Sequence, residues 1–235
     1  MPLQGSFQGV YPILATPFDD RENVDLESFG RIVRFMADIG VDGVTILGVL
    51  GESGRMVDSE REQLIRTAVE AAGRIPVIVG TSHKGTIATR TLSRMAESLG
   101  AGAVMVTPSR EPVPGEDRVF EYFRQTVQGI SIPVVVQDHP ASTEVHMSVE
   151  LMLRIVRENR MGDAWDLYRR FLPLIVFEQQ PGVAVRKEIL RMRGLIASGR
   201  VRHPGAGLNP DAAVQLRALL DRTLPGVDLT RPLAL

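Results

Sequence analysis

Apolar residues gather in short uninterrupted runs that alternate with longer stretches of amphipathic pattern. A short apolar run bounded by turn residues is typical of a strand buried on both faces of a sheet. The sequence therefore predicts five strands, at Val10–Thr16, Gly43–Gly48, Pro76–Thr81, Ala103–Pro108 and Pro133–His139.

The stretches between these runs carry apolar residues at three- and four-residue spacing, which predicts helices. These helices span Leu26–Ile39, Ser59–Gly73, Thr86–Leu99, Glu116–Gln128 and Ser148–Glu158. Local signals agree, with glycines as stops at Gly40, Gly73 and Gly100 and with N-caps at Asp58 and Ser148. A repeat of roughly 30 residues favours an α/β fold of the (β/α)8 TIM-barrel type.

The alternation of strands and helices stops after Asn159, and only helices are predicted beyond it. We expect these at Met161–Ile175, Val183–Ile196 and Asp211–Leu220, with Leu174–Phe177 as a helix end or, alternatively, a strand. The predicted organisation is five βα units of an incomplete barrel in residues 1–159. Residues 160–235 then form a helical C-terminal segment, made of the last barrel helix and an extension.

Composition excludes several classes of protein. The 235 residues have a formal net charge of −1 and are 44% hydrophobic, enough for one sizeable core. The basic residues are scattered, which gives no support to a nucleic-acid partner. The apolar runs are too short to span a membrane, and residues 1–8 do not resemble a signal peptide, so we expect a cytoplasmic protein. Without cysteine there is no disulfide and no thiolate chemistry.

Several short motifs resemble one known family. They are GVYPILATPF at residues 9–18, GVLGES at 48–53, VIVGT at 77–81 and VTP at 106–108. In order and spacing they resemble the dihydrodipicolinate synthase and N-acetylneuraminate lyase family, over Gly9–Asn159 and again from Met161 onward. The resemblance implies a class I aldolase, lyase or dehydratase without a cofactor, on a (β/α)8 barrel with a C-terminal helical extension, and a homo-oligomer (dimer or tetramer). The family's sixth, seventh and eighth strands have no counterpart here, a loss of roughly 60 to 90 residues by the barrel's repeat length.

The family's reaction depends on a lysine that this chain does not match. In the family, a lysine at the end of the sixth strand forms an imine with a 2-oxo acid. Lys84 and Lys187 are the two lysines here, and neither stands at that place. We expect Lys84 at the surface, with a substitute nucleophile as the minor alternative, and Lys187 in a structural role within a helix.

Candidate substrate-binding residues follow the second and fourth strands. The turn Gly48, Val49, Leu50 and Gly51 has lost the two hydroxyl residues that the family places between its glycines, but backbone amides near a helix start can bind a carboxylate. A plain strand-to-helix turn is the alternative. Arg110 stands where the family often has a tyrosine, and it could hold an acidic substrate bidentately or lie in an exposed loop.

Candidate catalytic residues follow the fifth strand, where Gln137–Pro140 replaces a stretch that has tyrosine and asparagine in the family. Gln137 can orient a carbonyl group, and His139 can transfer a proton if it points inward. A metal site from His83, Asp138, His139 and Glu52 is a rival prediction. Because the sequence has no tight pair of ligands, we predict no metal.

Two functions remain open. The first is a lyase that cleaves, condenses or dehydrates a 2-oxo acid, such as pyruvate or a deoxy sugar acid, through a lysine imine in the intact protein. The departures from the family's motifs argue against dihydrodipicolinate synthesis itself. The second is a truncated, catalytically inactive paralogue that acts as a subunit or binding module. Its first and fifth strands would be open edges that another chain must cover.

Overall fold

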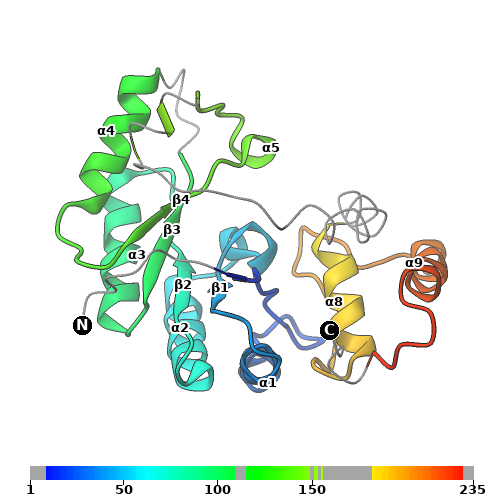
Figure 1. The fold of residues 1–235 in the computed structure, drawn as a ribbon. Helices are drawn as coiled ribbons and strands as arrows, with labels where there is room; N and C mark the ends of the chain where they lie inside the picture. The colour runs from blue at the N-terminus through cyan, green and yellow to red at the C-terminus, as the bar shows by residue number, and fades with distance from the viewer. Residues whose placement is uncertain (1–8, 109–114, 149–150, 153–154, 156–181, 230–235) are drawn as a thin grey trace.

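Four parallel strands form the centre of the fold. The computed structural model describes residues 9–108, 115–148, 151–152, 155 and 182–229 (Figure 1). The strands lie in the order β1, β2, β3, β4, and every neighbouring pair is parallel. Their bounds are β1 Val44–Ile46, β2 Val77–Gly80, β3 Ala103–Val106 and β4 Val134–Val136. Sequential parallel strands joined by helices are the arrangement that the repeat predicts for part of a (β/α)8 barrel.

The helices between the strands pack in chain order. They are α1 Leu26–Asp38, α2 Asp58–Ala72, α3 Thr86–Ser98 and α4 Glu116–Val127, each within a few residues of its prediction. Their ends follow the predicted glycine stops, since Gly40, Gly73 and Gly100 have φ of +79°, +60° and +93°. One predicted cap is wrong: Asp58 begins α2, and Val57 is the N-cap residue. The Glu60 carboxylate accepts the Val57 amide hydrogen at 3.1 Å, which fixes this helix start instead.

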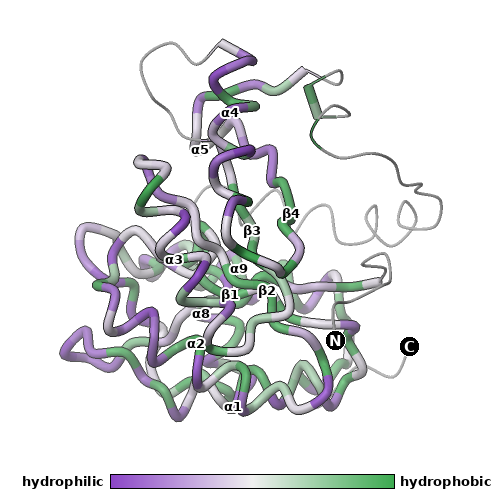
Figure 2. Tube along the Cα trace, turned by 90° about the vertical axis from the view of Figure 1, so that its left-hand side faces the viewer, coloured by the Kyte–Doolittle hydropathy of each residue, from purple (hydrophilic) through white to green (hydrophobic). Residues whose placement is uncertain are grey.

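The two faces of the sheet bury different sets of side chains. Alternate residues of β2 and β3 point to opposite faces, as the period of a strand requires. Val77, Val79 and Val104 belong to the large core under the helices, whereas Ile78 and Met105 belong to a smaller cluster on the inner face. Figure 2 shows β3 and β4 as hydrophobic; the residues of β3 are buried, as expected for a strand covered on both sides, whereas those of β4 are only half-buried.

The first predicted strand, Val10–Thr16, is reduced to a single bridge between Ile13 and Thr45. The Leu14 amide donates to the Thr45 carbonyl and the Thr45 amide to the Pro12 carbonyl, both at 2.8 Å. On its other side, the Ile13 carbonyl accepts a hydrogen bond from the Arg186 side chain at 3.2 Å. The prediction of a full strand is wrong here: Pro12 has no N–H to donate, and among the described residues the partner on the outer edge is the Arg186 side chain.

Only helices follow β4 in the described residues. They are α5 Pro140–Thr143, α8 Val183–Met192 and α9 Pro210–Thr223. α8 ends before its predicted end at Ile196, and Gly194 follows it with φ +70°. Of the predicted helix Ser148–Glu158, residues 151, 152 and 155 are helical. The predictions for Met161–Ile175 and Leu174–Phe177, and the boundary between 159 and 160, lie outside the described residues.

None of the helices in the described part of the chain combines the length and apolar character that crossing a bilayer requires.

Candidate functional site

The turn Gly48–Gly51 leaves the end of β1 in a short 3-10 helix, Val49–Gly51. The Gly51 amide donates to the Gly48 carbonyl at 3.0 Å, and the Glu52 amide donates to the Val49 carbonyl at 3.1 Å. The amides of Gly51 and Glu52 therefore already donate hydrogen bonds within the turn. A carboxylate at this place would have to be bound by the amides of Val49 and Leu50, the first of which belongs to a half-exposed residue.

The turn is held close to the inner face of the sheet. Leu47 is buried and has φ +57°, an uncommon conformation for a branched residue. A Cβ at Gly80 would lie 2.3 Å from the Leu47 carbonyl oxygen, so only glycine fits beneath this corner. The Thr16 hydroxyl donates to the Gly51 carbonyl at 2.7 Å and ties the turn to the first segment.

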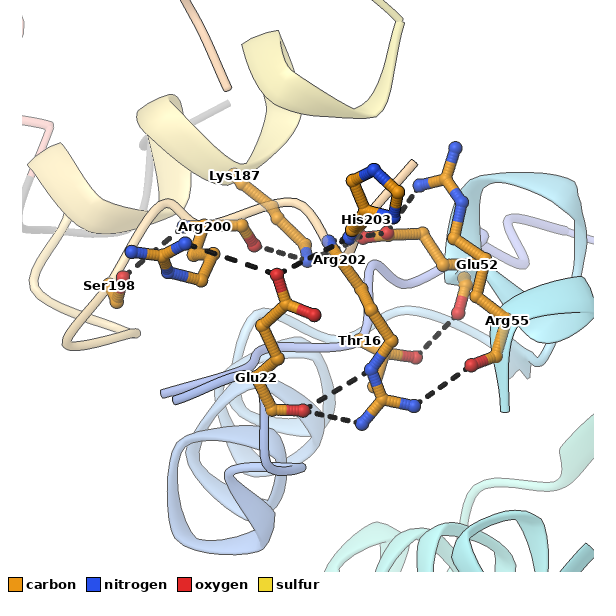
Figure 3. A network of polar contacts seen from close by, with 10 residues as sticks. Thr16, Glu22, Glu52, Arg55, Lys187, Ser198, Arg200, Arg202 and His203 are labelled. Atoms are coloured by element: carbon orange, nitrogen blue, oxygen red, sulfur yellow. Dashed lines mark hydrogen bonds and ion pairs between the residues drawn. The ribbon is translucent and has the colours of Figure 1, made fainter. Parts of the chain in front are cut away.

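A fully buried ion pair anchors the residue that follows the turn. Lys187 of α8 is 0% exposed, and its Nζ lies 2.5 Å from Oε1 of Glu52 (Figure 3). The same ammonium donates to the Arg200 carbonyl at 2.7 Å and lies 4.3 Å from the ring centroid of Phe18. Burial lowers the pKa of Lys187, and the hydrogen bond and charge of Glu52 oppose that shift. An amine so enclosed cannot reach a substrate, so Lys187 is structural, as predicted.

Arg202 closes the same network from the C-terminal segment (Figure 3). Its guanidinium donates to both carboxylate oxygens of Glu60 at 2.7 and 2.8 Å, to the Glu22 carbonyl at 2.5 Å and to the Arg55 carbonyl at 2.9 Å. Its backbone amide donates to Glu52 at 3.2 Å. The hydrogen bonds of Glu60 raise the pKa of Arg202, and those of Arg202 lower the pKa of Glu60. The network therefore fastens the C-terminal segment to the turn.

The sequence predicted none of these contacts. The sequence predicts a structural role for Lys187 but no partner for it, and no pattern in it points to Arg202 or Glu60. Its one signal is the carboxyl of Glu52 directly after the turn, which by itself indicates only a possible metal ligand. Because the partners come from opposite ends of the chain, no spacing in the sequence reports them.

The candidate catalytic residues lie at the same edge of the sheet as the turn. The amide of Gln137, the residue directly after β4, donates to the Val106 carbonyl at 2.9 Å, and His139 is the N-cap residue of α5. Both residues are half-buried. The turn, however, follows β1, three strands away, which is about 14 Å across a flat sheet. Arg110 lies outside the described residues.

The remaining candidates do not form a metal centre. Among the described residues there is no group of three histidine or carboxylate side chains arranged to hold a metal ion. Glu52 is occupied by Lys187 and by Arg55, whose Nη1 lies 2.6 Å from Oε2. Lys84 is exposed, as predicted, and lines a polar cavity of about 470 Å³ together with His83 and Arg61.

Residues 6–166 match the model of the dihydrodipicolinate synthetase family. Over 294 aligned positions the chain is 31% identical to the L-2-keto-3-deoxyarabonate dehydratase of Azospirillum brasilense, covering 93% of this chain and 95% of that protein. The alignment is longer than the chain's 235 residues, so the relative carries residues that have no counterpart here.

Three other matches differ in identity and in how much of the relative they cover. The 4-hydroxy-tetrahydrodipicolinate synthase of Aquifex aeolicus is 36% identical over 65% of this chain, but the match spans only 52% of that protein. A putative dihydrodipicolinate synthetase from Pseudomonas aeruginosa is a structural neighbour with a TM-score of 0.84 and 26% identity, covering 93% of this chain and 100% of that one. YagE from E. coli K12, solved in complex with pyruvate, has a TM-score of 0.80 at 21% identity and covers 93% of this chain and 99% of that one.

Proposed function

The chain belongs to the dihydrodipicolinate synthetase family, and on that premise we propose that it is the larger part of a lyase that dehydrates or cleaves a 2-oxo acid through a lysine imine in the intact protein. Its substrate would be a 2-keto-3-deoxy sugar acid or pyruvate, bound by its carboxylate at Gly48–Gly51. Arg110 would bind a second acidic or hydroxyl group of the substrate.

The near-complete match to a keto-deoxy sugar acid dehydratase carries this proposal. That relative is aligned over 95% of its length, whereas the synthase relatives are aligned over about half of theirs. The turn also favours a substrate other than that of the synthase, because Val49 and Leu50 have no hydroxyl to offer. We therefore propose dehydration of a keto-deoxy sugar acid ahead of dihydrodipicolinate synthesis.

The chemistry needs an amine that this chain does not supply. A lysine amine would add to the substrate's C2 carbonyl and lose water to give an imine. The imine draws electrons, so a proton can leave C3 and hydroxide can leave C4, which together amount to one water. Hydrolysis would then release the product and the amine. We assign His139 to proton transfer and Gln137 to the carbonyl or a hydroxyl.

An intact-mass measurement tests whether the lysine-bearing segment is part of the natural protein. A mass several kilodaltons above the 25.8 kDa of this chain would mean that the natural protein carries it. Borohydride treatment with pyruvate should then add one reduced pyruvate to the protein. If the longer protein showed no adduct, the imine proposal would be wrong.

A second candidate function follows if the mass equals that of this chain. The protein would then be a catalytically inactive family member that serves as a subunit or binding module. Both outer edges of the sheet favour this candidate: the first segment carries a single bridge, and the three residues of β4 are only half-buried whereas those of β2 and β3 are buried. Native mass spectrometry should then find a homo-oligomer or a complex with another chain, and a stable monomer would contradict it.

A further inference from the structure

A polar cavity lies where the loops after β1, β2 and β3 meet. Its volume of about 470 Å³ falls within the range of small-molecule sites. Its walls come from residues 53–56, from the start of α2, from residues 82–84 after β2 and from residues 107–108 after β3. None of the residues of the turn Gly48–Gly51 lines it, so the cavity is separate from the place to which the substrate's carboxylate is assigned.

Arg61 brings a buried cationic side chain to the wall of this cavity. The side chain is only 10% exposed, although arginine is rarely buried unless it is paired. Its Nη2 donates to the Ser53 carbonyl, whereas its Nε has no hydrogen-bond partner among the described residues. The Asp58 carboxylate is 3.6 Å from Nε, too far for a hydrogen bond, and is itself 80% exposed. The Nε–H is therefore a strong donor for an oxyanion that enters the cavity.

The described lining of the cavity holds two cations and one carboxylate. The cations are Arg61 and Lys84, and the carboxylate is that of Asp58. Burial lowers the pKa of Arg61, and the charge of Asp58 opposes that shift. A guanidinium stays charged at neutral pH even so, and an anion beside it would offset the cost of burying it. The cavity therefore favours an anion over a cation.

The loop after β2 is held so that His83 offers a donor. Its Nδ1 accepts the Gly85 amide hydrogen at 3.1 Å, so the proton of the neutral ring sits on Nε2. The His83 carbonyl lies 3.2 Å from the buried hydroxyls of Thr89 and Tyr122, and its amide donates to Thr89 at 3.1 Å. These bonds fix the loop without a ligand, which reduces the entropy that binding would cost.

We propose that this cavity is a binding site for a small organic anion, recognised through a carboxylate or phosphate group. The Nε–H of Arg61 donates to one oxygen of that group, the Nε2–H of His83 donates to the ligand, and Lys84 adds positive charge at the rim. The inference does not depend on the lysine imine, because none of these three side chains takes part in that chemistry.

The test uses the full 235-residue chain with inorganic phosphate and malonate as probes, and sodium chloride at equal ionic strength as the control. Isothermal titration calorimetry measures the affinity. Proton NMR of the four histidine rings reports the place, because all four lie in the described part of the chain and only His83 lines the cavity.

Three variants assign the site. Arg61→Gln removes the buried cation, and Arg66→Gln is its matched control on the same helix, at a residue that is 62% exposed and outside the cavity. Because Arg61 also holds the Ser53 carbonyl, Arg61→Gln may not fold. Lys84→Gln, at an exposed position of the cavity, then decides alone.

We expect one anion per chain and a shift of the His83 signal, and the tighter probe identifies the group that the site prefers. Affinity should fall about tenfold or more with Arg61→Gln and about threefold with Lys84→Gln, and should stay within about twofold with Arg66→Gln. The proposal would be overturned if neither probe bound, or if Arg61→Gln and Lys84→Gln bound as tightly as the unaltered chain. Equal binding by these variants would place the anion elsewhere, as at the turn Gly48–Gly51.

Discussion

Nζ of Lys187 and Oε1 of Glu52 lie 2.5 Å apart with both side chains almost completely buried. The pair links α8, near the C-terminal end of the chain, to the residue that follows the turn after β1. A buried pair gains little over an apolar pair of the same shape, but removing one partner leaves an uncompensated charge, which typically costs about 3–5 kcal/mol. The fold therefore depends on both members being present together.

Replacing Lys187 by methionine should lower the free energy of unfolding by about 3 kcal/mol, because Glu52 loses its closest cation. Chemical denaturation at pH 7 measures this change. Lys84→Met removes the other lysine from an exposed position and should change stability by less than about 0.5 kcal/mol. The double variant Lys187→Met/Glu52→Gln should lose less free energy of unfolding than the two single variants lose in sum. Strictly additive losses would mean that the two side chains do not interact.

Acid should weaken the contact between Arg202 and Glu60. The hydrogen bonds from Arg202 lower the pKa of Glu60 in the folded state, while a carboxyl in the unfolded chain titrates near about 4.3. At a pH between the folded-state and unfolded-state pKa of Glu60, the unfolded state binds more protons than the folded state. The stabilisation from this contact is therefore complete above about pH 4.3 and is lost as the pH falls through the folded-state pKa.

Unfolding free energies from pH 7 to pH 3 should therefore fall less steeply for Glu60→Gln than for the unaltered chain. In an Arg202→Gln background, Glu60→Gln should leave the pH profile almost unchanged. Parallel profiles for Glu60→Gln and the unaltered chain would contradict the assignment.

Gly80 should not tolerate a side chain. The Cβ of alanine would lie 2.3 Å from the carbonyl oxygen and 2.7 Å from the carbonyl carbon of Leu47, and this backbone cannot move without shifting the turn. We expect Gly80→Ala to lower the unfolding free energy by about 2–3 kcal/mol. Gly54→Ala is the control, since a Cβ there meets no atom within 4 Å. A neutral Gly80→Ala would mean that the corner at Leu47 is adaptable.

Arg202 should not be replaceable by lysine. Its planar guanidinium reaches three segments at once, through Glu22, Arg55 and Glu60, and an ammonium cannot match that geometry. Arg202→Lys should cost about 2 kcal/mol in thermal or chemical unfolding.

The same substitution at Arg66 is the matched control. Arg66 is 62% exposed and pairs with Glu62 one helical turn away, so Arg66→Lys should be nearly neutral. Equal effects at the two positions would mean that Arg202 acts only through its charge.

The alternation of apolar runs and amphipathic stretches was sufficient to predict the barrel units. Strands β2 and β3 and helices α1 to α4 form where the pattern predicts them. The spacing of apolar residues along the chain shows whether an element is buried on both faces, as a central strand is, or along one side, as a covering helix is. The prediction of a full first strand was wrong, since an edge depends on the neighbour that pairs with it, and Arg186 lies there instead. The short helix α5 carried no pattern that could have predicted it.

The sequence alone determined the family and the repeat of strand and helix. It also predicted the turn Gly48–Gly51, because two glycines bound a short stretch after a strand. Tertiary structure alone decided that Lys187 and Arg202 hold that turn through Glu52 and Glu60. Local spacing records which face a residue presents to its neighbours in sequence, whereas an ion pair between distant segments forms only when folding excludes water from both.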